Sequence, residues 1–176
     1  MRLDLGLLLV VLGSTPVMAQ QVCDTSIYPL SAPSGRFIDN GNGTVTDTAT
    51  HMMWMRCSIG QSWTGSTCAG AATPMTWQAA MDAAGALNKQ GGYAGHIDWR
   101  IPRIPELAAI AERQCANPRT NITIFPNTAA VFYWTASNRH GNGNENQAFM
   151  LSFGPEGTGG AVKTEKHLAR LIRASQ

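Results

Sequence analysis

The sequence contains little charge and no strong excess of either sign. Charged residues make up 14% of the chain, and the formal net charge is +2. Proteins that bind nucleic acid through their surface charge carry a basic patch or stripe and a much stronger positive balance. We therefore expect no nucleic-acid partner.

Familiar catalytic and phosphate-binding motifs are also missing. There is no Gly-x-Ser-x-Gly nucleophile elbow, no phosphate-binding glycine loop and no His-Glu pair of the zinc-protease type. The histidines are scattered along the chain, at His51, His96, His140 and His167. His96 lies close to Asp98, and this pair is a candidate for part of a site. Convergent active sites need no motif, but the sequence favours a protein that is not an enzyme and needs no cofactor.

Long apolar runs are confined to the N-terminus. Arg2 precedes the apolar run Leu5–Leu12, and Val17-Met18-Ala19 follows as a cleavage site, so residues 1–19 predict a secretory signal peptide. The run is shorter than the roughly 20 apolar residues that cross a bilayer. No comparable run follows it, which predicts no membrane span and a secreted or periplasmic location.

Cys-x-x-Cys spacing is absent, which disfavours a zinc site, and we expect no bound metal. Four cysteines behind a signal peptide predict two disulfides, for which three pairings exist. The segment between Cys57 and Cys68 is rich in Gly, Ser and Thr and favours a local bridge that closes it. Elimination then pairs Cys23 with Cys115.

The segments that remain are rich in turns, in keeping with 18 glycines. Residues 20–35 form an extended lead-in. Arg36–Asp39 and Thr44–Asp47 flank an Asn-Gly turn, which predicts a β-hairpin. The side chains of Asp39, Asn42 and Asp47 also offer oxygens for calcium, but the turn lacks the ligand pattern of an EF-hand loop. A hairpin turn is the interpretation, and calcium binding stays open.

Two helices are predicted. The first covers Thr76–Gln90, with Thr76 as its cap and apolar residues at helical spacing, and it ends at Gly91. Gly85 inside it suggests that another element packs closely there. The second begins near Pro105 and runs to about Cys115.

Short strands occupy much of the rest. They are predicted at Met52–Met55, Val131–Thr135, Ala148–Phe153 and Leu168–Arg173. This order predicts one α+β domain in which two helices pack on an antiparallel β-sheet, stabilised by disulfides. Four tryptophans are expected in the core and Trp63 in a more exposed loop; the four are Trp54, Trp77, Trp99 and Trp134.

The polar segment Ser137–Gln147 is the candidate for ligand binding, because loops on a rigid scaffold commonly carry recognition. Asn and Arg side chains suit hydroxyl and sulfate groups. A solvated loop without a partner is the alternative. The candidate residues in the loop are Arg139, His140, Asn142, Asn144 and Glu145. Further positive charge would come from Lys163, Lys166 and His167 if the last part of the chain lies alongside.

Several motifs, in order, resemble a bacterial domain found at the C-terminus of a collagen-like adhesin, the Lcl C-terminal type. The resemblance covers Gly35–Arg173, and residues 36–176 are assigned to the domain. The motifs are Arg36–Asp47, Met53-Trp54, Asp98–Pro102 with Glu106-Leu107, Phe125–Thr128, Trp134–Ser137 and Arg170–Arg173. Two positions depart from the pattern: His51 replaces a usual glycine, and Arg103 replaces a usual polar helix cap.

The resemblance implies a fold similar to C-type lectin-like and sulfatase-modifying-factor-like domains, an extracytoplasmic location and, in the adhesin, attachment to sulfated glycans. The Trp-Asn-Asp triplet of calcium-dependent lectins is missing, so the fold alone does not imply lectin activity. The leading hypothesis is a recognition domain that binds a glycan or a cell-surface protein through its loops. A structural component of a cell-surface complex is the alternative. An enzyme of the sulfatase-modifying-factor type is disfavoured, because the cysteines are expected in disulfides. The sequence leaves the oligomeric state open.

Overall fold

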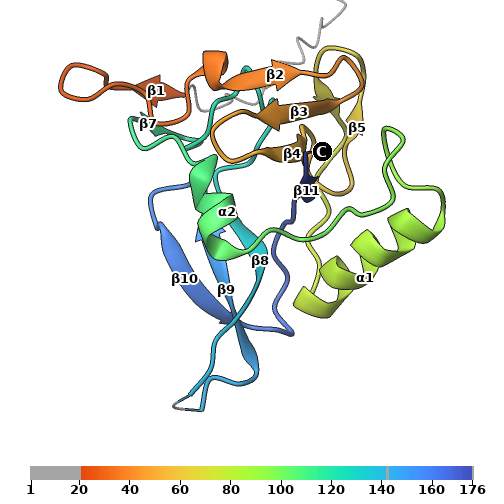
Figure 1. Cartoon of the computed structure of the whole chain (residues 1–176). Helices are drawn as coiled ribbons and strands as arrows, with labels where there is room; N and C mark the ends of the chain where they lie inside the picture. Colours follow the sequence, from red (N-terminus) through yellow and green to blue (C-terminus); the bar gives the residue numbers. More distant parts are fainter. Residues whose placement is uncertain (1–20, 142, 176) are drawn as a thin grey trace, which may run out of the picture.

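Two antiparallel sheets make up the framework of the chain (Figure 1). The computed structural model describes residues 21–141 and 143–175, so the predicted signal peptide and Asn142 lie outside the described residues. One sheet has the order β11-β4-β3-β2 and the other β10-β9-β8. The strands of the first are β2 (Phe37–Asp39), β3 (Thr44–Asp47), β4 (Met52–Met55) and β11 (Ile172–Ala174). Those of the second are β8 (Phe132–Asn138), β9 (Gln147–Ser152) and β10 (Thr158–Val162).

The predicted hairpin is confirmed as β2 and β3, with Ile38 opposite Thr46. Its turn needs glycine, because Gly43 has a φ of 83° and a side chain there would collide with Trp63 and Tyr93. Two short ribbons complete the antiparallel pairings. They join β1 (Val22–Cys23) to β7 (Cys115–Ala116), and β5 (Ser62–Trp63) to β6 (Cys68–Ala69).

The first helix, α1 (Trp77–Lys89), is capped as predicted, since the Thr76 hydroxyl accepts a 3.3 Å bond from the amide of Ala79. The expectation that an element packs against Gly85 was wrong, because a Cβ built there would meet no atom within 4 Å. Neither α1 nor any other helix in the described residues is long and apolar enough to cross a membrane.

The second helix, α2 (Ile104–Ala109), ends earlier than predicted. After Ile110 the chain folds back on itself: the hydroxyl of Thr120 donates to the carbonyl of Ile110 at 2.9 Å. The buried carboxylate of Glu112 then accepts bonds from the amides of Ser31 and Ala32 at 2.9 and 2.7 Å. Residues after Ile110 were predicted to continue the helix. In the structure they instead hold the N-terminal lead-in in place.

The predicted strands differ from the structure in two ways. The last strand of the sheet covers only Ile172–Ala174, whereas His167 and Leu168 pair with Met75 and Tyr133 in isolated bridges. β10 was not predicted at all, because its centre is Gly159-Gly160 rather than β-branched residues. These glycines lie against Phe132, Met150 and Arg139, whose side chains occupy the space that larger residues would need.

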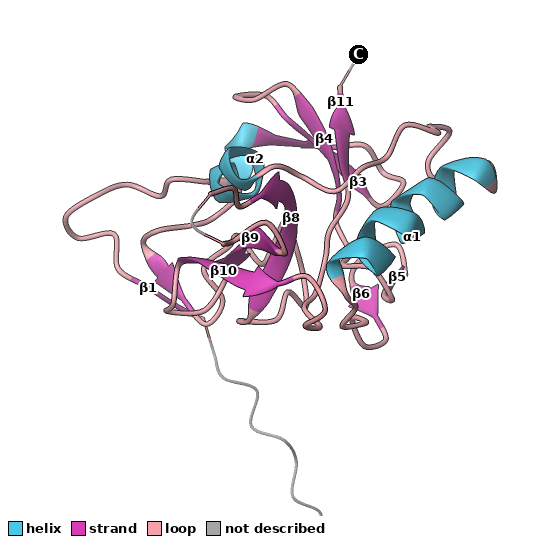
Figure 2. Cartoon of the chain, turned by 90° about the horizontal axis from the view of Figure 1, so that it is seen from below, coloured by secondary structure: helices cyan, strands magenta, loops and turns pink. Residues whose placement is uncertain are grey.

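The helices cover opposite faces of the β8–β9–β10 sheet (Figure 2). Neighbouring residues of β8 point to opposite faces, so Tyr133 packs with Leu107 of α2 whereas Trp134 packs in the cluster that contains Ala80 of α1. Trp54, Trp99 and Trp134 are buried as predicted. Trp77 is partly buried and packs against the core cluster that contains Trp134, and Trp63 is partly exposed.

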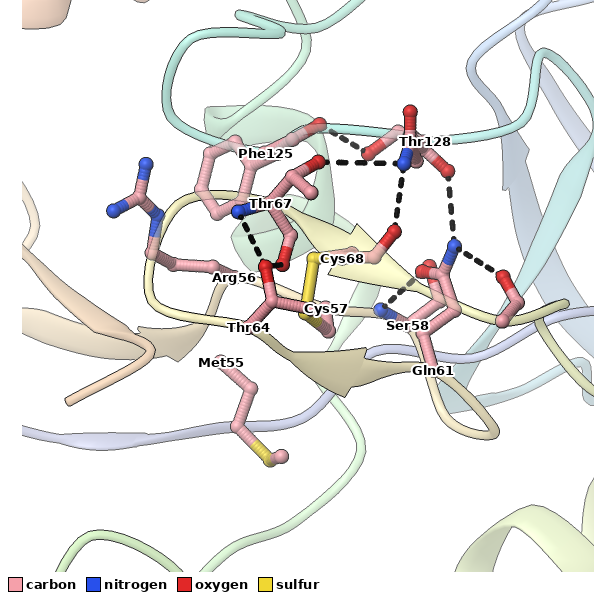
Figure 3. The surroundings of a disulfide bond; sticks show 12 residues. Met55, Arg56, Cys57, Ser58, Gln61, Thr64, Thr67, Cys68, Phe125 and Thr128 are labelled. Atoms are coloured by element: carbon pink, nitrogen blue, oxygen red, sulfur yellow. Dashed lines mark hydrogen bonds between the residues drawn. A yellow bond between two sulfur atoms is a disulfide. The ribbon is translucent and has the colours of Figure 1, made fainter.

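Both predicted disulfides are present, Cys23–Cys115 and Cys57–Cys68. The first pins the lead-in to β7, and the second closes the β5–β6 loop (Figure 3). Asn127 fastens that loop further, since its side-chain amide donates to the carbonyl of Cys68 at 2.6 Å. Two disulfides indicate an oxidising environment, extracellular or periplasmic.

A buried guanidinium lies where several segments meet. Arg170 is 1% exposed and donates to the backbone carbonyls of Met55 and Arg56 and, at 2.6 Å, to the hydroxyl of Thr128. Its guanidinium also lies 4.7 Å from the ring centroid of Phe125. Burial lowers the pKa of Arg170 from its ordinary value to about 10, so the side chain remains charged at neutral pH.

We expect Arg170→Ala to lower the free energy of unfolding by about 3–5 kcal/mol, because it creates a cavity and leaves buried acceptors without donors. Urea denaturation measures this change. The exposed Arg113 is the matched control, and Arg113→Ala should change stability by no more than about 0.5 kcal/mol. Equal effects of the two substitutions would contradict the structural role of Arg170.

The ion pair between Arg36 and Asp47 should make stability depend on acid pH. Burial raises the pKa of Asp47, but bonds from Arg36, Thr50 and the amide of Ala49 outweigh it and hold the pKa below 3.8. The unfolded state then binds more protons, so the stabilisation is present above the ordinary pKa and is lost as the pH falls.

We therefore expect stability to fall between about pH 5 and pH 2. Asp47→Asn should lower the stability at pH 7 and remove part of that decline. Denaturation midpoints across the pH range measure both effects. A decline as steep in Asp47→Asn as in the native protein would show that this pair is not responsible.

Candidate functional site

The predicted ligand-binding loop forms the tip of the β8–β9 hairpin, which projects from one end of the molecule (Figure 1). The loop is shorter than predicted, because β8 continues to Asn138 and β9 begins at Gln147. The amide of Arg139 closes its base by donating to the carbonyl of Gln147 at 3.1 Å. We call residues 139–141, residues 143–146 and Lys163 the hairpin-tip surface.

Arg139 lies over the base of the hairpin. Its Nη1 donates to the side-chain oxygen of Gln147 at 2.8 Å, and its guanidinium lies 5.6 Å from the centroid of the Phe149 ring. The Cδ atom and the guanidinium of the side chain cover Gly160 on β10. These contacts hold the charge in a fixed place while leaving the residue partly exposed.

Lys163 does lie alongside the loop, as the sequence allowed. Its amide donates to the carbonyl of Asn146 at 2.9 Å, and its ammonium donates to that of Glu145 at 3.3 Å. The ammonium also lies 4.5 Å from the centroid of the Trp77 ring, at the start of α1. His140 and Glu145 are exposed on the same loop, and Asn144 folds back onto the carbonyl of Gly141 at 3.1 Å.

Lys166 and His167 lie elsewhere than the sequence hypothesis required. Both line a separate pocket of about 420 Å³. The His167 ring contacts Trp134 and Phe132 edge-on, with centroids 4.8 and 6.0 Å apart, and its Nε2 is 3.4 Å from the carboxylate of Glu165. The candidate residues that the structure describes therefore divide between two surfaces.

Asp98 serves the fold rather than a site with His96. Its carboxylate accepts a 2.7 Å bond from Arg173, and this bond is the main reason that the pKa of Asp98 lies below 3.8. The His96 ring lies edge-on to Trp99, with centroids 6.5 Å apart. The pair thus helps to anchor the loop around the buried Trp99.

The oxygens considered for calcium are taken up by other partners. Both carboxylate oxygens of Asp47 accept bonds from Arg36. Those of Asp39 accept from the amide of Gly41 at 2.8 Å and from Arg56 at 2.7 Å, and the Asn42 oxygen accepts from the hydroxyl of Thr44 at 2.7 Å. Within the described part of the chain, no three His, Cys, Asp or Glu side chains gather in a way that would hold a metal ion.

The pocket beside Lys166 and His167 was not predicted from the sequence. Its other lining residues come from three separate segments, and none belongs to a recognisable motif: Ala72, Pro74, Ala129, Val131, Phe132 and Leu168. In the sequence, small apolar residues of this kind cannot be distinguished from ordinary core or loop residues. Only the fold brings them together around a pocket.

Calcium should have no effect on this protein if the turn is only a hairpin turn. We expect no rise in Tm with about 5 mM calcium chloride, a concentration above the Kd of weak extracellular calcium modules. Differential scanning calorimetry with calcium and with an equal ionic strength of sodium chloride makes the comparison. A rise specific to calcium would reopen the metal reading of Asp39, Asn42 and Asp47.

The family described as the Lcl C-terminal domain matches residues 43–173. The match begins in the β2–β3 turn, ends within β11 and includes both helices and the whole β8–β9–β10 sheet. A search of curated proteins finds no significant match. Because the match covers well over half of the sequence, the chain belongs to the Lcl C-terminal domain family.

Proposed function

We propose that this protein is a non-catalytic recognition domain that binds an anionic, sulfated glycan through its hairpin-tip surface. We also infer that it adopts a C-type lectin-like fold and reaches the periplasm or the cell exterior through the signal peptide at residues 1–19. Resemblance to the adhesin domain supports the ligand class, and the two disulfides support the location.

The observation that carries the proposal is the junction between Lys163 and the hairpin loop. The Lys163 ammonium donates to the backbone carbonyl of Glu145 at 3.3 Å, and Arg139 donates to the side-chain amide oxygen of Gln147 at 2.8 Å. Both acceptors are neutral. Neither cation has a carboxylate within ion-pair distance in the part of the chain that the structure describes. Two cations fixed on strand ends beside an exposed polar loop suit a sulfate-bearing ligand.

The carboxyl groups with lowered pKa values support a non-catalytic function, because each contacts a structural partner. Burial raises the pKa of Glu106, yet bonds from Arg100 and from the amide of Arg103 lower it overall. Burial also raises the pKa of Glu112, but bonds from the amides of Ala32 and Ser31 lower this pKa overall. All four cysteines form disulfides, so they offer no thiol nucleophile.

A structural component of a cell-surface complex is the second candidate. It is favoured by exposed apolar side chains on the N-terminal lead-in, where Val22, Ile27 and Tyr28 are 68%, 77% and 65% exposed. Apolar groups gathered on one exposed segment are typical of protein interaction sites.

Binding to heparin and to a sulfated glycan array tests the proposal. Removing both cations in Arg139→Gln/Lys163→Gln should lower affinity about two- to thirtyfold, if each exposed charge contributes about 0.2–1 kcal/mol. The matched control is Arg113→Gln/Lys89→Gln, which removes the same charge from exposed positions on other elements. Affinity of the native protein should also fall as salt rises.

The control variant should bind as the native protein does. Equal losses in the two double variants would reveal a general charge effect and exclude the hairpin-tip surface as a specific site. No retention of the native protein on heparin at low salt, together with no array signal, would overturn the glycan proposal and leave the structural candidate.

A further inference from the structure

Three distant segments meet beside the β8–β9–β10 sheet. The backbone of His167 exchanges two bonds with that of Met75, at 2.9 and 3.0 Å. On its other side, the amide of Leu168 donates to Phe132 at 3.2 Å, and the amide of Trp134 donates to Leu168 at 2.8 Å. Backbone bonds on both sides hold the segment 166–168 between the other two, so the surface that they form is built in advance of any ligand.

A pocket of about 420 Å³ lies on this surface, and we call it the Lys166 pocket. Small apolar side chains line it: Ala72, Pro74, Ala129 and Val131, with the buried Leu168 beside them. Val131 is 46% exposed, which is high for a branched apolar residue next to the core. Pockets of about 300–1,000 Å³ with apolar walls and a few polar groups are typical small-molecule sites.

The charge at this pocket is positive. Its lining includes Lys166 and His167 but no Asp or Glu. The imidazole of His167 lies 3.4 Å from the Glu165 carboxylate and edge-on to two aromatic rings. Lys166 is exposed and takes part in no ion pair among the described residues. Its ammonium is therefore available to an anion.

We propose that the Lys166 pocket binds a small amphipathic carboxylate, with an aryl or short alkyl body against the apolar walls and the carboxylate beside Lys166. The apolar walls account for affinity by removing the body from water. The ammonium accounts for the preference for an anion over a neutral molecule of the same shape. This site is independent of the hairpin-tip surface, which contains neither Lys166 nor the apolar walls.

Titration of the native protein with 4-phenylbutyrate and with the uncharged 4-phenyl-1-butanol, followed by two-dimensional amide NMR, tests the proposal. Both probes should shift the resonances of Ala72, Ala129 and Val131, and 4-phenylbutyrate should bind about two- to fivefold more tightly, as expected for one exposed ion pair. In Lys166→Gln, the ratio of the two affinities should fall to about one. Lys89→Gln removes an equal charge from the end of α1 and should keep the ratio of the native protein.

Filling the pocket should abolish the binding of both probes. Ala129→Phe and Ala72→Leu approach it from different segments, and either one that retains the native amide spectrum suffices. Three results would each overturn the proposal: no saturable shifts with about 10 mM 4-phenylbutyrate, a preference for the anion that survives in Lys166→Gln, or full binding in a folded pocket-filling variant. Loss of heparin binding in the hairpin-tip variants would leave these outcomes unchanged, so the two proposals can fail separately.

Discussion

The buried guanidinium of Arg170 constrains how the two sheets of the fold meet. A buried cation without a carboxylate beside it is stable only if fixed oxygens surround it. The carbonyls of Met55 and Arg56 and the hydroxyl of Thr128 supply such oxygens to Nη1 and Nη2, whereas Nε has no hydrogen-bond partner among the described residues. These acceptors come from the end of β4 and from the chain that precedes β8, so the charge of one side chain fixes how the two sheets meet.

Other arginines extend this arrangement outward from the core. Arg56 joins the carbonyls of Ile124 and Thr123 to the carboxylate of Asp39, and its guanidinium lies 4.2 Å from the centroid of the Trp63 ring. Arg36 and Arg173 pair with Asp47 and Asp98 at opposite edges of the four-stranded sheet. Much of the limited charge in this chain therefore holds loops to the core, whereas Arg139, Lys163 and Lys166 form no ion pair among the described residues.

These two surfaces differ in their physical basis. The hairpin-tip surface offers cations and polar groups on an exposed loop, so attraction to a ligand there weakens with salt. The Lys166 pocket offers apolar walls and one cation, so most of its affinity would come from burial and would change little with salt. The two proposals therefore place an extended polar ligand on one surface of the α+β framework and a small amphipathic carboxylate on the other.

Local patterns in the sequence correctly predicted the elements whose geometry is set by residues close together in the chain. The Asn-Gly turn, the Thr76 cap and the short Cys57–Cys68 segment each predicted what the structure contains, because their geometry depends mainly on neighbouring residues. The contact between Lys163 and the loop was expected only if the last part of the chain lies alongside the loop, which the sequence did not establish. The class of fold followed from the order of the predicted elements. The family resemblance rested on several motifs, of which the Asn-Gly turn within Arg36–Asp47 is one.

Tertiary structure decided whatever depends on distant partners. The cap that Arg103 cannot supply comes from the Ser137 hydroxyl, which accepts a 3.1 Å bond from the amide of Ile104. His51 takes the left-handed conformation, with a φ of 54°, at the position where a glycine is usual. β10 pairs through glycines because neighbouring side chains fill the space above them. The Lys166 pocket was beyond prediction for the same reason: hydrogen bonds between segments far apart in the sequence create it, and no single segment carries its pattern.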